Sequence, residues 1–375
     1  MRMRTAAIAF GGFVILGLPT GMLGVAWPSI RSELDAPLAG LGIVLAAMTV
    51  VMFGSSAVSG IVRQRFGTIA LLLVPTVLSA GGLLLFTLAQ TWPTIILAAA
   101  VLGAGLGLLD AAFNMEAALR RGIRFMAALH ASWAVGATLG PALIGLVLVI
   151  GGSWRLGYTA AAFAFVAFAI STYLVRGDLV AAPESEDAPI ATRGARGVAV
   201  MGAALMFVYV GIELGAGQWS FTRLTTNDAL TDGLAGLAVF LYWAALATGR
   251  VALALLGGRV SAERLIDLSV AGTFASALAF WILPPPIAAL IALPSIGLSL
   301  SVFVPVLLYL IPRRVGRAAA PHVIGYLVAA GMIGGAVLPA GIGLVLQSTG
   351  VSSLGICLST LAAAFGVIHV AARGR

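Results

Sequence analysis

Apolar runs of membrane-spanning length repeat along the whole of this chain. Of its 375 residues, 61% are hydrophobic and only 9% are charged, whereas an ordinary soluble domain carries about 25% charged residues. One helical span needs roughly 20 apolar residues, and lone strands leave backbone groups unsatisfied in lipid. We therefore predict an all-α membrane protein with twelve transmembrane helices. The predicted runs cover residues 5–27, 38–62, 68–90, 93–119, 126–150, 156–176, 198–222, 233–256, 265–283, 287–311, 321–346 and 351–372.

The distribution of arginine predicts the topology. The chain has 21 basic residues, all of them arginine, and a formal net charge of +8. If the N-terminus is cytoplasmic, eighteen arginines, Arg250 among them, lie at the cytoplasmic ends of the runs, and only Arg31, Arg155 and Arg223 lie at the other ends. This bias predicts a multi-pass protein of the inner (plasma) membrane with both termini in the cytoplasm. It also accounts for the net charge without a nucleic-acid partner.

The longest polar interval divides the runs into two groups of six. Residues 177–197 hold two prolines and a cluster of acids, which is typical of a solvated linker. Residues 134–148 and 332–346 are identical at eight of fifteen positions, at a constant offset of 198. We therefore predict two pseudo-symmetric six-helix bundles, at residues 1–176 and 198–375, joined by a cytoplasmic linker.

Duplicated bundles are typical of alternating-access transporters, in which two similar halves rock about a site near the midplane. The other interpretation is that duplication only makes a larger scaffold. Acids at membrane depth favour transport, because a carboxylate at the centre of a bilayer helix costs about 2.5 to 3.5 kcal/mol on insertion scales.

Three acids inside the predicted runs are singled out as candidates: Asp110, Glu116 and Glu213. Asp110 and Asn114 are four positions apart, so they share one helix face at about 40° of separation. Glu116 stands four residues before Arg120, the favourable order for an ion pair at the cytoplasmic end of a helix. Asp110 has no such partner on its own helix, so it either pairs with another helix or takes up a proton.

Glu213 lies among three glycines in the run VYVGIELGAGQWSFTRL, which predicts a locally weakened helix. An interrupted helix would bring Glu213, Gln218 and Trp219 to a cavity, where they suit a polar ligand stacked on an aromatic ring. The other interpretation is that Glu213 bonds to a neighbouring helix and that Trp219 lies in the interfacial aromatic belt.

His130 opens the fifth run, where it either carries a proton at physiological pH or caps the end of a bundle. The sequence contains no P-loop and no HExxH, and its three histidines are far apart. We expect no metal, no cofactor and no enzyme activity. The energy for transport would come from an ion gradient.

The segment Gly60–Gly67 after the second run resembles the loop motif of the major facilitator superfamily, which has the form G-x-L-a-D-R-x-G-R. Gly60, Arg65 and Gly67 match this motif, whereas Gln64 replaces its acid. The resemblance covers the whole chain and implies two homologous halves of six spans around a central solute pathway.

Within that superfamily, the stretch Leu109–Asn114 is similar to the fourth helix of the fucose permease branch, where an acid is followed four residues later by asparagine. The stretches 129–133, 209–213 and 218–219 also resemble that branch. The resemblance implies that Asp110 is the proton-coupling carboxylate and that Asn114 faces a sugar. The branch's sugar carriers have a second acid on the first helix, whereas residues 5–27 contain none.

The sequence thus predicts a proton-coupled secondary transporter of a small polar solute, a sugar-like or related metabolite, that functions as a monomer in the lipid bilayer. Two alternatives stay open. The Gly136-xxx-Gly140-Pro141 spacing resembles drug–proton antiporters and would fit efflux of hydrophobic or amphipathic compounds; a receptor or scaffold that transports nothing is the third interpretation. The predicted roles are proton coupling for Asp110 and Glu213; solute binding for Asn114, Gln218 and Trp219; gating or proton relay for His130, Glu116 and Arg120; and the cytoplasmic loop motif for Gly60, Arg65 and Gly67.

Overall fold

The computed structural model describes residues 3–120, 123–178, 195–256, 260–316 and 319–373. Within these ranges the regular structure is entirely helical, and twelve helical segments are long and apolar enough to cross a membrane. The predicted fold class is therefore confirmed. Contacts divide the chain into two compact units, Met1–Ser185 and Glu186–Arg375. The predicted linker at 177–197 falls mostly on residues 179–194, which lie outside the described residues.

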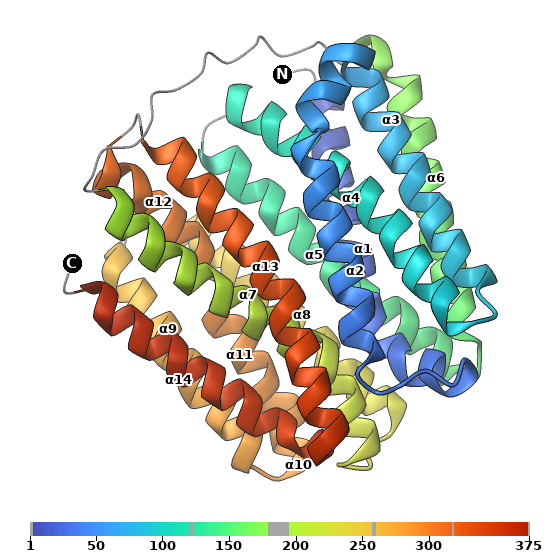
Figure 1. The fold of residues 1–375 in the computed structure, drawn as a ribbon, viewed down its shortest axis with the longest axis vertical. Coiled ribbons are helices and arrows are strands. Elements are labelled where there is room, and N and C mark those ends of the chain that lie inside the picture. Colours follow the sequence, from blue (N-terminus) through green and yellow to red (C-terminus); the bar gives the residue numbers. More distant parts are fainter. Residues whose placement is uncertain (1–2, 121–122, 179–194, 257–259, 317–318, 374–375) are drawn as a thin grey trace. The chain divides into compact units, whose positions relative to one another are not determined.

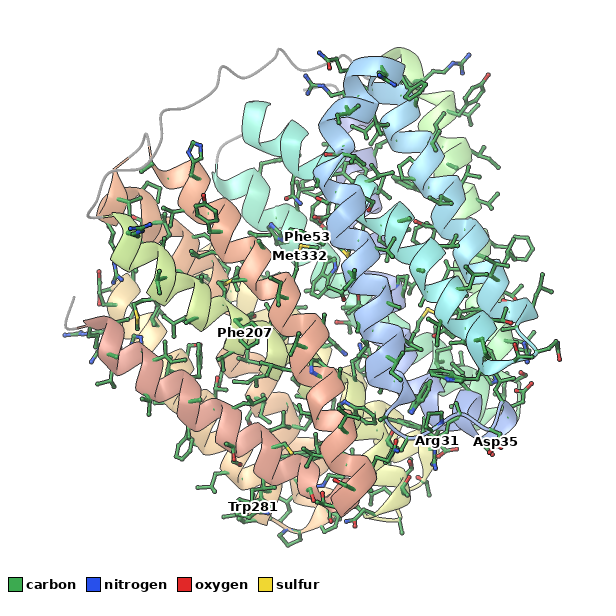
Figure 2. All side chains as sticks on the ribbon, viewed as in Figure 1. Arg31, Asp35, Phe53, Phe207, Trp281 and Met332 are labelled. Atoms are coloured by element: carbon green, nitrogen blue, oxygen red, sulfur yellow. The ribbon has the colours of Figure 1, made fainter. Side chains whose placement is uncertain are left out.

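Unit 1 contains the first six spans (Figure 1). In this unit α1 packs along α5, α2 packs along α4, and α3 packs along both α4 and α6. We call the end at which α1 finishes, at Glu33, the distal end of the unit. Arg31 and Asp35, labelled in Figure 2, mark this end. The helices are α1 (Met3–Glu33), α2 (Gly40–Ala57), α3 (Ser59–Leu88), α4 (Trp92–Arg120), α5 (Ile123–Val149) and α6 (Trp154–Leu174), followed by the 3₁₀ turn η1 (Arg176–Asp178).

Unit 2 repeats the same pairing of helices. Here α7 packs along α13, α8 along α11, and α9 along α14 and α11. Its distal end is likewise the end at which its first helix, α7, finishes. The elements are α7 (Ala195–Thr226), α8 (Asp232–Leu256), α9 (Ala262–Ile282), α10 (Pro285–Ile287), the π turn η2 (Ala288–Ala292), α11 (Leu293–Leu300), α12 (Phe303–Val315), α13 (Ala320–Thr349), η3 (Val351–Ser353) and α14 (Leu354–Arg373).

Two glycines paired by the sequence repeat occupy equivalent positions in the two units. A Cβ on Gly136 of α5 would lie 1.9 Å from the carbonyl oxygen of Val14 in α1. A Cβ on Gly334 of α13 would lie 2.0 Å from the carbonyl oxygen of Phe207 in α7, which Figure 2 labels. Small residues allow helix backbones to approach this closely in membranes. The repeated segment is thus the packing seam between the fifth and first helices of each unit.

The predicted loop between the second and third spans is instead a short helix. Residues 59–66 form the start of α3, and Gly67 then breaks the helix with a φ of 80° and a ψ of 171°. A continuous 30-residue helix would be about 45 Å long, well beyond the roughly 30 Å hydrocarbon layer. The break leaves residues 68–88 as the span proper. Arg65 and Gly60 are exposed on the short helix, so only Gly67 has a conformational role that the backbone requires.

The interrupted helix predicted in the seventh span lies in the tenth span instead. Helix α7 is continuous through Gly211, Gly215 and Gly217, because each of these glycines accommodates a side chain of a neighbouring helix rather than a bend. The tenth span, Pro285–Val315, contains the π turn η2 and a turn at residues 301–302 that separates α11 from α12. The fourth span, its counterpart in unit 1, is the single helix α4.

Candidate functional site

A buried ion pair between α7 and α8 is the strongest candidate site in unit 2. The Nη2 atom of Arg250 lies 3.1 Å from Oε1 of Glu213, and the two side chains are only 9% and 7% exposed. Two charges removed from water are tolerated only when they compensate each other and make further hydrogen bonds. The pair therefore has zero net charge as long as both partners stay ionised.

Two tyrosines add hydrogen bonds to this pair. Arg250 Nη2 also donates to the hydroxyl of Tyr209, at 3.3 Å, one helical turn before Glu213. The hydroxyl of Tyr242 donates to the backbone carbonyl of Glu213 at 2.7 Å. Both tyrosines are fully buried. The four residues form one polar cluster inside an apolar bundle, which we call the Glu213 cluster.

The Glu213 cluster adjoins the break in the tenth span. The ring of Tyr209 stacks on that of Phe303, the first residue of α12, with 5.2 Å between ring centroids. Gly249, next to Arg250, faces the turn so closely that a Cβ there would lie 2.1 Å from Oγ of Ser301. A buried ion pair thus lies beside irregular backbone inside a bundle, and discontinuous helices of this kind form the solute and ion sites of many transporters.

The backbone carbonyls of Leu298 and Ser299 at this break both accept hydrogen bonds. Leu298 accepts hydrogen bonds from both the backbone N–H and the hydroxyl of Ser301. The carbonyl oxygen of Ser299 accepts a hydrogen bond from Oγ of Ser269 in α9, at 2.6 Å. The break is therefore held by specific contacts with α8 and α9, as a built feature of unit 2.

Arg250 corrects one part of the sequence analysis, which grouped it with the arginines at cytoplasmic ends. Its side chain is buried and paired with Glu213, because six further residues of α8 follow it. That signal was present in the sequence, since the predicted run 233–256 also extends six residues beyond Arg250. The second interpretation of Glu213, a bond to a neighbouring helix, is the one that the structure supports.

The structure does not bring Gln218 and Trp219 to Glu213. They lie five and six positions after it, which rotates them by about 140° and 240° around α7. Trp219 is fully buried, and its Nε1 donates to the carbonyl oxygen of Pro339 in α13 at 2.9 Å, so it does not belong to an interfacial belt. Gln218 is 1% exposed. Their predicted role in solute binding has no support from this geometry.

Asp110 and Asn114 share one face of α4, as predicted. The Nδ2 atom of Asn114 donates to the backbone carbonyl of Asp110 at 3.0 Å, and both side chains are half-buried. Among the residues that the structure describes, no basic side chain forms an ion pair with Asp110. Unit 1 therefore carries an acid whose charge is not compensated by a neighbouring cation in the described part of the chain.

The predicted gating residues are only partly visible. His130 of α5 is half-buried and meets the ring of Phe13 edge-on, at 5.6 Å between centroids. The side chains of Glu116 and Arg120 lie outside the described residues, so their predicted ion pair remains a prediction. Over the described part of the chain, no group of three or more His, Cys, Asp or Glu side chains could hold a metal ion.

One acid was passed over in the sequence, although it lies within the predicted run 265–283. Oδ1 of Asp267 in α9 lies within hydrogen-bonding distance of Nε2 of His369 in α14, at 2.8 Å. Asp267 also forms an ion pair with Arg373. The cluster joins α9 and α14 at the end opposite to the distal end of unit 2. It ties two helices that already pack along each other, so it stabilises the unit locally.

Comparison with known proteins gives a consistent classification. The family model described as the Major Facilitator Superfamily matches residues 9–339. The chain is 24% identical over 376 residues to an uncharacterized MFS-type transporter of Yersinia pestis, an alignment that covers 95% of this chain and 90% of that protein. It is also 25% identical over 137 residues to the sodium-dependent glucose transporter 1A of Mus musculus, covering 36% of this chain and 32% of that one.

Among solved structures, the chain is similar to the nucleoside transporter NupG. The TM-score is 0.77, and the superposition covers 99% of this chain and 98% of NupG. The sequence identity of 12% limits this likeness to the fold. The fold comparison nevertheless fits two six-helix halves.

Proposed function

Because the chain belongs to the Major Facilitator Superfamily, we propose that this transporter works by alternating access and couples proton movement to the movement of a small polar solute. The solute is a sugar-like or related metabolite. We further propose that it resides in the inner (plasma) membrane with both termini in the cytoplasm, so that the distal ends of both units face outward. Each chain carries both halves, so a monomer is sufficient.

The observation that carries the proposal is the buried Glu213–Arg250 pair beside the break in the tenth span. When Glu213 takes up a proton, Arg250 loses its compensating charge and needs another hydrogen-bond acceptor. A polar group of the solute can supply that acceptor. Proton binding and solute binding then favour each other at one place, which is the thermodynamic requirement for coupling.

In unit 1 we assign proton coupling to Asp110 and solute contact to Asn114. Asp110 is half-buried at membrane depth, and a charged carboxylate there is costly unless it faces a hydrated path or takes up a proton. Its resemblance to the acid of the fucose permease branch supports the same role. His130 remains our candidate for a proton relay on α5.

The experiment is gradient-driven accumulation in proteoliposomes. Radiolabelled uridine and D-glucose are the first solutes to test, because similar proteins are named for nucleosides and glucose. With an imposed proton gradient we expect wild-type protein to accumulate one of them above equilibrium and Asp110→Asn to allow equilibration only. A variant of the exposed Gln64, Gln64→Ala, serves as the control. Equal accumulation by Asp110→Asn and wild type would refute the assignment of Asp110.

Efflux of amphipathic compounds was suggested by the spacing of Gly136 and Gly140. Both glycines lie in the close packing of α5 on α1, where a Cβ on Gly140 would approach the carbonyl oxygen of Leu18 to 2.5 Å. Helix packing thus accounts for the spacing, which gives efflux no support of its own.

A further inference from the structure

Arg223 is one of the three arginines predicted to lie at the outward ends of spans, and its side chain is buried. It lies near the distal end of α7, three residues before the helix finishes at Thr226, and is only 6% exposed. Arginine is disfavoured at the outward ends of spans, and a buried guanidinium needs several hydrogen-bond acceptors because it carries five donors. A buried arginine at this position therefore requires hydrogen-bond acceptors around its guanidinium.

The partners found around Arg223 are incomplete. Its Nε lies 3.5 Å from Oδ2 of Asp228, beyond good hydrogen-bonding distance, and its guanidinium carbon lies 4.3 Å from the ring centroid of Phe280 in α9. Asn227 donates to the other carboxylate oxygen of Asp228, at 2.7 Å. Within the described residues, Nε and Nη1 of Arg223 and Oδ2 of Asp228 are buried without a hydrogen-bond partner.

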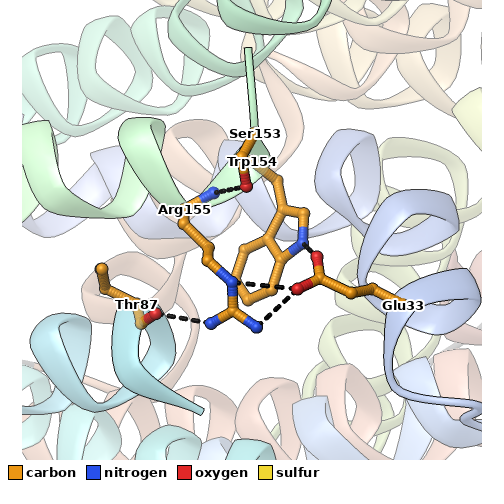
Figure 3. Close-up of polar contacts among 5 residues, drawn as sticks. All are labelled: Glu33, Thr87, Ser153, Trp154 and Arg155. Carbon is orange, nitrogen blue, oxygen red and sulfur yellow. Dashed lines mark hydrogen bonds and ion pairs between the residues drawn. The ribbon is translucent and has the colours of Figure 1, made fainter. Parts of the chain in front are cut away.

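A second outward-end arginine, in unit 1, shows what a completed pair looks like (Figure 3). Arg155 of α6 donates from Nε and Nη2 to Oε1 of Glu33, at 3.1 and 2.7 Å, and from Nη1 to the carbonyl oxygen of Thr87. Trp154 donates to the second oxygen of Glu33 at 2.6 Å. That cluster joins α1, α3 and α6. Each of these polar atoms has a hydrogen-bond partner, so the role of the cluster is structural.

The difference between the partly bonded Arg223 and the fully bonded Arg155 is the basis of the inference. An unsatisfied buried polar group costs about 1 to 3 kcal/mol, and more when it is charged, and more than about 90% of buried polar groups in proteins have a partner. Arg223 offers unused donors and Asp228 an unused acceptor, side by side, while the ring of Phe280 covers the guanidinium. The group that completes this pair must accept and donate hydrogen bonds at once. A hydroxyl does both.

We propose that Arg223 and Asp228 form a recognition site for a hydroxyl group of an uncharged, polyhydroxylated solute, at the distal end of unit 2. The pair has no net charge to attract an ion, and this favours a neutral ligand. Arg223 lies ten positions after Glu213 on α7, about 15 Å further along the helix axis. It is thus a separate binding site, which a solute that enters from the distal end meets before it reaches the Glu213 cluster. This inference rests on the proposed function and adds a solute class to it.

The test is equilibrium binding of three neutral probes to purified full-length protein: uridine, D-glucose and myo-inositol. We expect at least one probe to bind to wild type. The double variant Arg223→Gln with Asp228→Asn removes both charges without leaving one buried alone, and should bind that probe ten- to hundredfold more weakly. The matched control, Glu33→Gln with Arg155→Gln, neutralises the completed pair of unit 1 and should leave the affinity within about twofold of wild type.

Three results would overturn the inference. The first is that none of the three probes binds to wild type; the second is that the double variant binds as tightly as wild type, which would mean that water alone completes the pair. Tighter binding of the anion D-gluconate than of D-glucose would also contradict it. Proton-gradient accumulation by wild type and by Asp110→Asn tests the proposed function separately. Wild-type protein that binds a probe at Arg223 but does not accumulate it would refute coupling and leave this site intact.

Discussion

At the scale of single residues, the positions that matter most are those where a charge is buried. Glu213 and Arg250 compensate each other as a buried pair, Arg155 pairs with the exposed Glu33 through additional hydrogen bonds, and Arg223 is buried with donors unused. A completed pair contributes to a unique structure, whereas the incomplete pair at Arg223 is the basis for the solute site that we propose there. The three arginines Arg250, Arg155 and Arg223 therefore have three different roles in one chain.

Neutralising only one member of the Glu213 cluster should destabilise the protein more than neutralising both. Arg250→Gln leaves a buried, unpaired carboxylate, for which we expect a loss of about 3 to 5 kcal/mol in the free energy of unfolding. The double variant Arg250→Gln with Glu213→Gln keeps two neutral groups able to bond and should lose much less. Denaturant unfolding in detergent gives both values. If the double variant were as unstable as Arg250→Gln, an unpaired charge would not be the cause.

At the scale of helices, close glycine contacts set which pairs form. The fifth helix of each unit contacts the first through Gly136 and Gly334, whereas the glycines near Glu213 make room for Leu338, Ile342 and Trp243 without bending α7. Glycine in a sequence signals freedom to bend and freedom to approach equally well. Only the neighbouring helix decides between them, which is why the break in the tenth span could not be assigned from sequence.

Two glycines of α13 provide a matched test of this packing. A Cβ on Gly334 would lie 2.0 Å from the carbonyl oxygen of Phe207, whereas a Cβ on Gly341 meets nothing within 4 Å. Gly334→Ala should therefore destabilise unit 2 by about 1 to 3 kcal/mol, because α13 must move away from α7. Gly341→Ala should be neutral or slightly stabilising, since alanine favours helix by up to about 1 kcal/mol over glycine. Thermal unfolding compares the two variants; equal midpoints would contradict the packing seam.

At the scale of the whole molecule, twelve spans and the positions of Asp110 and Asn114 on one face could be predicted from sequence. Bilayer thickness and the helical period act locally along the chain, so their signals are local too. The pairing of Arg250 with Glu213 joins residues 37 positions apart through the packing of α8 on α7, which no local pattern encodes. The sequence therefore identified the acid Glu213 and missed its partner.

The central claim is that a proton taken up by a buried carboxylate moves together with the solute. It is tested most directly by the pH of a weakly buffered suspension of proteoliposomes after addition of the solute that the transporter carries. We predict that the medium becomes alkaline as the solute enters wild-type vesicles, and that Glu213→Gln abolishes this change while Gln64→Ala preserves it. Solute entry into wild-type vesicles at constant external pH would contradict the account.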